Sequence, residues 1–112
     1  MRHAYLIIAH NEFEILQTLI SALDDERNDI FVHIDKNIKV LPELEARQST
    51  LYVLKKRIDV RWGHVSQIKT ELLLFETALK NGPYDFYHLI SGTHLPLKSQ
   101  DAIHGFFEQK EG

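Results

Sequence analysis

The sequence of 112 residues contains no cysteine and has only one methionine, one tryptophan, three prolines and five glycines. Without cysteine the chain cannot form a disulfide framework, a thiolate metal site or a cysteine nucleophile. This absence fits a reducing compartment, so we expect a cytoplasmic protein. The low glycine and proline content, beside 44% hydrophobic and 26% charged residues, excludes disordered and collagen-like chains and predicts a globular domain.

Long hydrophobic runs and an excess of basic charge are also absent. The longest uninterrupted apolar stretch is residues 4–9, far shorter than the roughly 20 residues that a membrane-spanning helix needs. The formal net charge of -3 argues against a nucleic-acid partner. One basic triplet, Lys55-Lys56-Arg57, predicts a solvated turn; the alternative is a role in attracting an anionic ligand or in peripheral contact with a membrane.

Strand-like and helix-like segments alternate along the chain. Compact apolar runs at residues 4–9, 30–35 and 86–90 predict strands, of which the first is buried on both faces. Apolar residues at helical spacing predict helices over residues 13–23 and 65–79. This alternation predicts the α/β class, with a twisted, mostly parallel, Rossmann-like sheet and helices on both of its faces.

The remaining segments have weaker patterns. Asn11 is the predicted N-cap of the first helix, and residues 41–47 have a weak helical pattern. Residues 51–54 and 58–60 both resemble short strands, and only one of them needs to join the main sheet. A last helix, capped by Ser99, would carry Ile103, Phe106 and Phe107.

Polar residues follow the predicted strands, at the edge where open α/β sheets bind their ligands. Asp35 ends a buried strand, where a carboxylate can accept hydrogen bonds from a ribose or a base edge; the alternative is a turn or cap aspartate. Trp62 could stack on a planar base and Gly63 would allow close approach, although a lone tryptophan is more often part of a core.

The seven histidines suggest a metal site, but their spacing does not support one. The chain has no His-x-His, His-Glu-x-x-His or Asp-x-Asp motif, so we predict that it binds no metal. Ser91-Gly92 lacks the surrounding Gly-x-Ser-x-Gly pattern of a hydrolase nucleophile. A metal-dependent hydrolase that uses the histidines therefore remains only a weaker alternative.

Taken in order, four motifs resemble the N-terminal half of the core-2/I-branching glycosyltransferase family, which also includes the peptide xylosyltransferases. The resemblance spans nearly the whole chain, and four ordered motifs are more specific than any one alone. The motifs are residues 4–10, residues 31–36, residues 60–63 ahead of a helix, and residues 87–92 followed by 95–99.

The resemblance implies a GT-A-like fold whose first half holds a UDP-sugar, usually UDP-N-acetylglucosamine or UDP-xylose. The sugar would be transferred with inversion to a glycan, a polysaccharide or another hydroxyl acceptor. It also implies that no metal cofactor is needed, because the family lacks the Asp-x-Asp motif. By matching positions, the nucleotide would contact Ile8, Ala9, His10, Asp35, Trp62 and Gly63. The sugar and acceptor side would be bordered by Ser91, Gly92 and His94.

One departure concerns His94, which stands where the family usually has an acidic residue. The family's catalytic Glu and the basic residues that neutralise the diphosphate belong to its C-terminal half, which we expect beyond Gly112. Residues 1–112 are therefore expected to form a single nucleotide-sugar-binding domain, inactive alone, whose partner is that half. Exposed Phe106 and Phe107 would favour self-association. The alternative function is a non-catalytic α/β nucleotide-binding or interaction module.

Overall fold

The computed structural model describes residues 1–61 and 64–91. Within these ranges, strands and helices follow one another largely as the sequence predicts, but no helix separates the second strand from the third. Their bounds are β1 (His3–Ala9), α1 (Phe13–Leu23), β2 (Asn28–Ile34), β3 (Thr50–Val53), α2 (Val65–Asn81) and β4 (Phe86–Ser91). Neither helix is long and apolar enough to cross a membrane.

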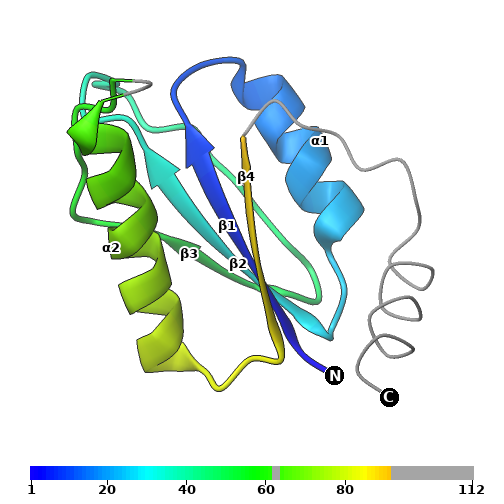
Figure 1. Cartoon of the computed structure of the whole chain (residues 1–112). Helices are drawn as coiled ribbons and strands as arrows, with labels where there is room; N and C mark the ends of the chain where they lie inside the picture. The colour runs from blue at the N-terminus through cyan, green and yellow to red at the C-terminus, as the bar shows by residue number, and fades with distance from the viewer. Residues whose placement is uncertain (62–63, 92–112) are drawn as a thin grey trace.

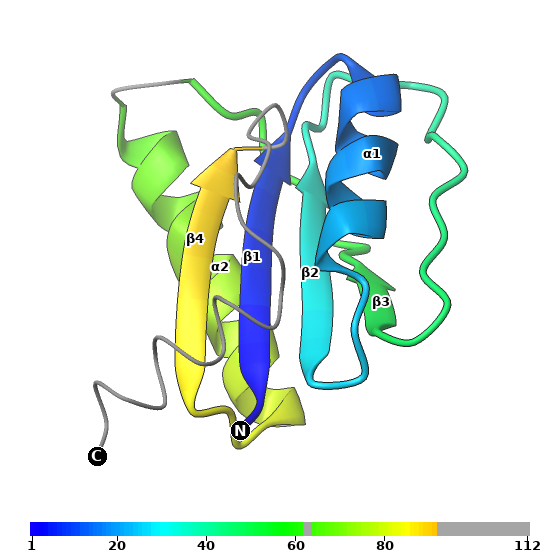
Figure 2. The ribbon, with the colours of Figure 1, turned by 90° about the vertical axis from the view of Figure 1, so that its right-hand side faces the viewer.

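The strands form one sheet in the order β3-β2-β1-β4, and every neighbouring pair is parallel. The helices cover opposite faces of this sheet, with α1 on one side and α2 on the other (Figures 1 and 2). The predicted class, a Rossmann-like α/β fold with a parallel sheet, is confirmed. Because Ala9 pairs with Ile34 and Ile8 with Ser91, three strands end at nearly the same level.

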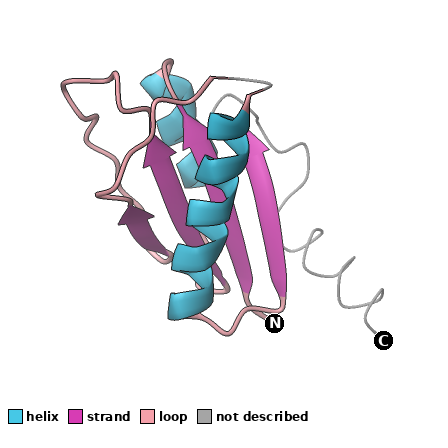
Figure 3. Cartoon of the chain, turned by 60° about the vertical axis from the view of Figure 1, so that its left-hand side comes forward, coloured by secondary structure: helices cyan, strands magenta, loops and turns pink. Residues whose placement is uncertain are grey.

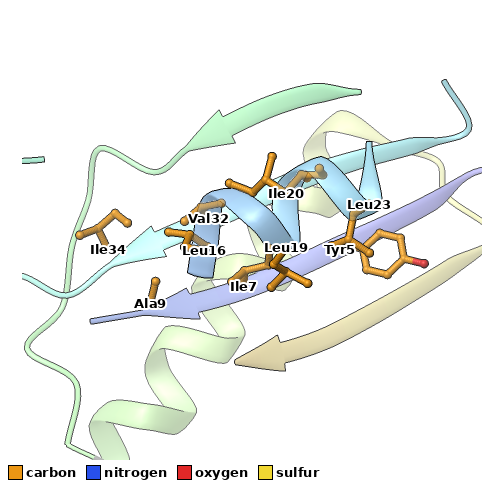
Figure 4. Packing of buried hydrophobic residues seen from close by; sticks show 10 residues of the cluster. Tyr5, Ile7, Ala9, Leu16, Leu19, Ile20, Leu23, Val32 and Ile34 are labelled. Carbon is orange, nitrogen blue, oxygen red and sulfur yellow. The ribbon is translucent and has the colours of Figure 1, made fainter. Parts of the chain in front are cut away.

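The core is divided into two layers by β1, whose seven residues are all buried. Side chains alternate across a strand, so Tyr5, Ile7 and Ala9 pack on the α1 side and the residues between them pack on the α2 side. The α1 layer is shown in Figure 4. It includes the buried helix residues Leu16, Leu19, Ile20 and Leu23.

The predicted cap of α1 is wrong. Glu12, not Asn11, occupies the N-cap position, and its side chain makes no capping hydrogen bond. Its φ of 52° lies in the left-handed region, which only a few per cent of non-glycine residues adopt. The chain must reverse between the end of β1 and the start of α1 within three residues, 10–12. The backbone of Glu12 makes that reversal.

The helix predicted over residues 65–79 is confirmed as α2, but its apolar stripe faces outward. An amphipathic helix normally turns such a stripe toward the core. In α2 the buried side chains are Thr70, Leu74 and Ala78, and the Thr70 hydroxyl donates to the Ser66 carbonyl at 2.8 Å. Figure 3 shows α2 in front of the sheet. The residues of the stripe that are 58% to 65% exposed are Val65, Ile68, Leu72 and Leu79.

One weaker prediction is also wrong. Residues 41–47 form no helix, and the chain at the end of this segment is bonded to the side chain of Asp24. Its carboxylate accepts backbone N–H groups from Arg47, Gln48 and Ser49 at 2.6 to 2.8 Å. Burial acts to raise the pKa of Asp24, but these hydrogen bonds lower it overall.

Of the two strand candidates, only the first joins the sheet, as β3. Residues 58–60 form no strand, because their backbone groups are bonded to the end of β2, as described below. The predicted last helix lies outside the described residues, and so do Phe106 and Phe107.

A polar network closes the amino end of the sheet. Asp29 at the start of β2 accepts a hydrogen bond from the Arg2 guanidinium at 2.8 Å, and another from the Tyr84 hydroxyl. The Arg2 backbone N–H donates to the carboxylate of Asp85 at 2.7 Å. Burial is the main cause that raises the pKa of the Tyr84 phenol, and the hydrogen bond to Asp29 raises this pKa further. This network joins the N-terminus to the turn between α2 and β4.

Two leucines on opposite sides of α2, Leu72 and Leu74, test the orientation of the helix. We expect Leu74→Ala to lower the free energy of unfolding by about 2 to 5 kcal/mol, because it leaves a cavity beneath the helix. Leu72→Ala should change that free energy by only about 0.5 kcal/mol or less, since its side chain is exposed. Urea unfolding of both variants measures the difference. Equal losses of stability would show that the outward stripe packs into the core after all.

Candidate functional site

The polar residues that follow the strands gather at one edge of the sheet. This edge is formed by the carboxyl ends of the strands, and both helices begin there (Figure 1). His10 and Asn11 follow β1 and are exposed, whereas Asp35 follows β2 and is buried. Arg61 and His64, both exposed, precede α2.

Asp35 is the buried acid of this edge, with 6% of its surface exposed. Its backbone N–H donates to the carbonyl of Ala9 at 2.9 Å, which holds the end of β2 against the end of β1. Its Oδ1 accepts the backbone N–H (2.9 Å) and the Nδ2 group (3.1 Å) of Asn37, and its Oδ2 accepts the N–H of Val60 (3.3 Å). A carboxylate offers about four acceptor positions, and the described residues occupy three of them.

The loop of residues 54–61 is fixed onto the end of β2 by hydrogen bonds. The Ile58 N–H donates to Nε2 of His33 at 2.9 Å, and the Ile58 carbonyl accepts the N–H of Lys36 at 3.1 Å. Arg57 donates to the carbonyls of Ile38 (2.9 Å) and Asp35 (3.3 Å). The basic triplet of the sequence is therefore only partly solvated, because Arg57 has a structural role.

His33 is held as a neutral imidazole. An Nε2 atom that accepts an N–H carries no proton, so the proton must lie on Nδ1. That Nδ1 is buried and has no hydrogen-bond partner among residues 1–61 and 64–91. Burial lowers the pKa of His33, although the nearby carboxylate of Asp35 acts in the opposite direction.

Two further residues extend the edge toward α2. The Nδ2 group of Asn37, which donates to Asp35, also donates a hydrogen bond to the carboxylate of Asp59 at 2.7 Å. The other carboxylate oxygen of Asp59 lies 3.9 Å from the guanidinium of Arg61. The side chain of Arg61 is 74% exposed, which leaves this cation open to an anionic ligand. The roles of Asn37 and Asp59 were not predicted from the sequence. The one available signal was the Asp-Lys-Asn order of residues 35–37, which is typical of a turn built on an aspartate side chain.

The other predicted site residues differ in how they could meet a ligand. Ile8 and Ala9 are buried in the two core layers, so only their backbone could contact a ligand, whereas His10 is exposed. Ser91 ends β4 in register with Ile8. No group of three or more His, Asp or Glu that could hold a metal occurs in the described part of the chain. The predicted residues Trp62, Gly63, Gly92 and His94 lie outside it.

A parallel sheet with a polar carboxyl edge, flanked by two helices that begin there, defines a Rossmann-like α/β fold of the kind found in the first half of GT-A enzymes. The chain belongs to the Core-2/I-Branching enzyme family, whose model matches residues 3–112. No curated protein sequence matches it significantly. The resemblance carried by the four motifs is thus confirmed. The family is one of glycosyltransferases, which transfer a sugar from a nucleotide-sugar donor to a glycan acceptor.

The buried neutral His33 should make stability depend on pH. Its pKa is lowered in the folded chain, whereas in the unfolded chain it should be about 6.5. Between these two values the unfolded chain binds more protons, so stability rises with pH there. The contribution of the neutral His33 to stability is complete above about pH 6.5. It is lost as the pH falls toward the pKa of His33 in the folded chain.

We expect His33→Gln, which keeps an acceptor near the Ile58 N–H but cannot titrate, to flatten the loss of stability between about pH 6.5 and 5. Thermal unfolding of both proteins across this range gives the comparison. A wild-type slope that survives in His33→Gln would contradict the assignment of a neutral, buried imidazole.

Proposed function

We propose that the carboxyl edge of the sheet binds the UDP part of a UDP-sugar. The sugar, N-acetylglucosamine or xylose, would then be transferred with inversion to a glycan or polysaccharide hydroxyl. One observation carries this proposal: the buried Asp35 carboxylate lies at the end of β2, beside the end of β1, and the described residues fill three of its roughly four acceptor positions. In a chain of a glycosyltransferase family, we expect the nucleoside to bind at this carboxyl end of the sheet.

The remaining acceptor position of Asp35 suits a donor on the nucleoside, such as a ribose hydroxyl or the N–H group of uracil. The exposed His10 would border the base, together with the backbone of Ile8 and Ala9. Trp62 would stack on the uracil and Gly63 would allow its approach. Ser91, Gly92 and His94 would border the sugar, in keeping with the family resemblance.

The diphosphate would be held by cations instead of a metal. Arg61 and Lys36 are exposed at or beside the edge, and the amino end of α2 adds the positive end of a helix dipole. We assign no general base among the described residues, because both acids next to these cations are engaged: Asn37 donates to Asp35 and to Asp59. The role proposed for this part of the chain is donor binding.

The assignment of Asp35 can be tested apart from its role in the turn. We expect Asp35→Asn to weaken UDP binding by about 1 to 3 kcal/mol, because a charged acceptor is lost. Asn37→Ala disturbs the same turn but leaves the carboxylate in place, so it is the matched control and should bind UDP nearly as well as the wild type. Isothermal calorimetry with UDP, and with ADP as a control ligand, measures these affinities.

Loss of affinity in both variants by the same amount would mean that Asp35 acts only through the turn. Thermal unfolding of the two variants shows whether each one folds.

The family resemblance also predicts that Trp62→Ala weakens UDP binding, by about 1 to 3 kcal/mol for the loss of a base stack.

UDP binding should not depend on a divalent cation. Mn²⁺ and Mg²⁺ prefer clustered oxygen ligands, and the chain has no Asp-x-Asp motif to supply them. We expect the same UDP affinity with added Mn²⁺ and with a chelator. An affinity on the order of tenfold higher in Mn²⁺ would show that a metal holds the diphosphate.

A further inference from the structure

The outer face of α2 carries an apolar stripe that no other described element covers. Val65, Ile68, Leu72 and Leu79 are each more than half exposed, and they extend along about four helical turns. Together they present on the order of 400 Å² of apolar surface, comparable to the largest patch on a typical monomer, which is often an interaction site. The proposed nucleotide site does not use these residues.

Cations lie along one side of this stripe. Lys36, Lys56 and Lys69 line a groove of about 520 Å³ together with Leu72, and Asp59 and Glu76 also border it. Lys55 lies in the neighbouring groove between β3 and α2. Residues 55–80 carry six Lys and Arg against three Asp and Glu. The stripe is therefore bordered by a net positive charge, although the whole chain is negative.

The acidic residues are concentrated on the opposite side of the sheet. Residues 12–29, which include α1, carry six Asp and Glu against one Arg. The sheet separates α1 from α2 (Figure 1), and each helix with its side chains is about 10 Å across. The outer surfaces of the two helices therefore lie farther apart than the screening length of about 8 Å at physiological salt. An anionic partner at the outer face of α2 would thus contact mainly the lysines that border the apolar stripe.

We propose that the outer face of α2 docks the protein on an anionic lipid surface. The four aliphatic side chains would enter the boundary between headgroups and acyl chains, and Lys55, Lys56 and Lys69 would extend their ammonium groups to the lipid phosphates. A second copy of the chain fits this face less well, because pairing two copies through it would bring like charges together. The proposal does not depend on UDP binding.

The test is co-sedimentation of the 112-residue chain with lipid vesicles. We expect it to bind vesicles that contain about one third phosphatidylglycerol, not those of phosphatidylcholine alone, and to be released by salt. Exchanging Ile68 and Leu72 for glutamine should weaken binding on the order of tenfold or more, because the inserted side chains become polar. Lys56→Gln and Lys69→Gln should weaken it about fivefold for each charge removed.

Matched controls come from the loop after β2, whose Leu44 packs on the α1 side. Val40→Gln with Leu41→Gln removes two exposed apolar side chains, and Lys39→Gln removes one exposed cation. These controls should bind vesicles as the wild type does. So should Asp35→Asn, which separates lipid binding from UDP binding.

Three results would overturn the proposal. The first is failure of the wild type to bind anionic vesicles, and the second is a loss of binding by the controls as large as that of the α2 variants. The third is a concentration-dependent dimer in ultracentrifugation that the glutamine variants of Ile68 and Leu72 abolish, without any vesicle binding by the wild type. Circular dichroism verifies the fold of each variant, and the lysine variants keep the test decisive if the apolar pair does not fold.

Discussion

The position of β1 is the constraint on which the rest of the structure depends. It pairs with β2 on one edge and with β4 on the other, and all seven of its residues are buried. A strand with two paired edges and two covered faces cannot shift by one residue without exchanging its two core layers. Its register therefore fixes where β2 and β4 end. The end of β2 in turn fixes the position of Asp35. The network around Asp29 closes the amino end of the sheet, and the polar residues that follow the strands lie at the opposite edge.

The elements that were predictable from the sequence are those whose pattern is local. The apolar run of β1 and the helical spacing in α1 and α2 each identify a structure within one segment, and alternation of such segments implies a parallel sheet. The orientation of α2 was not predictable in this way. Its buried side includes Thr70 and Ala78, which are poor indicators of a core, and Thr70 is tolerated there because its hydroxyl bonds to a carbonyl within the helix. The apolar periodicity predicts the helix, but packing against the sheet determines which side of the helix is buried.

The same distinction applies to the candidate site. Asp35 could be chosen from the sequence because it follows a buried strand. Its hydrogen-bond partners could not, since Val60 comes from a loop that returns to the end of β2 after a separate strand. That return depends on His33, whose buried Nε2 accepts the N–H of Ile58. A histidine within a strand gives no sign of which distant backbone group it will bind, so sequence patterns alone could not place the loop of residues 54–61.

The two proposals meet in the geometry of α2. The helix begins at the carboxyl edge, where the donor nucleotide would bind, and its apolar stripe starts at its first residue, Val65. A helix that lies flat in a lipid surface holds both of its ends at the same depth. The carboxyl edge would then open beside the headgroups instead of above them, while the acidic surface of α1 faced away from the lipid. An acceptor held at that surface would meet the donor after diffusion in two dimensions, which raises the effective concentration of the acceptor without any additional contact to the protein.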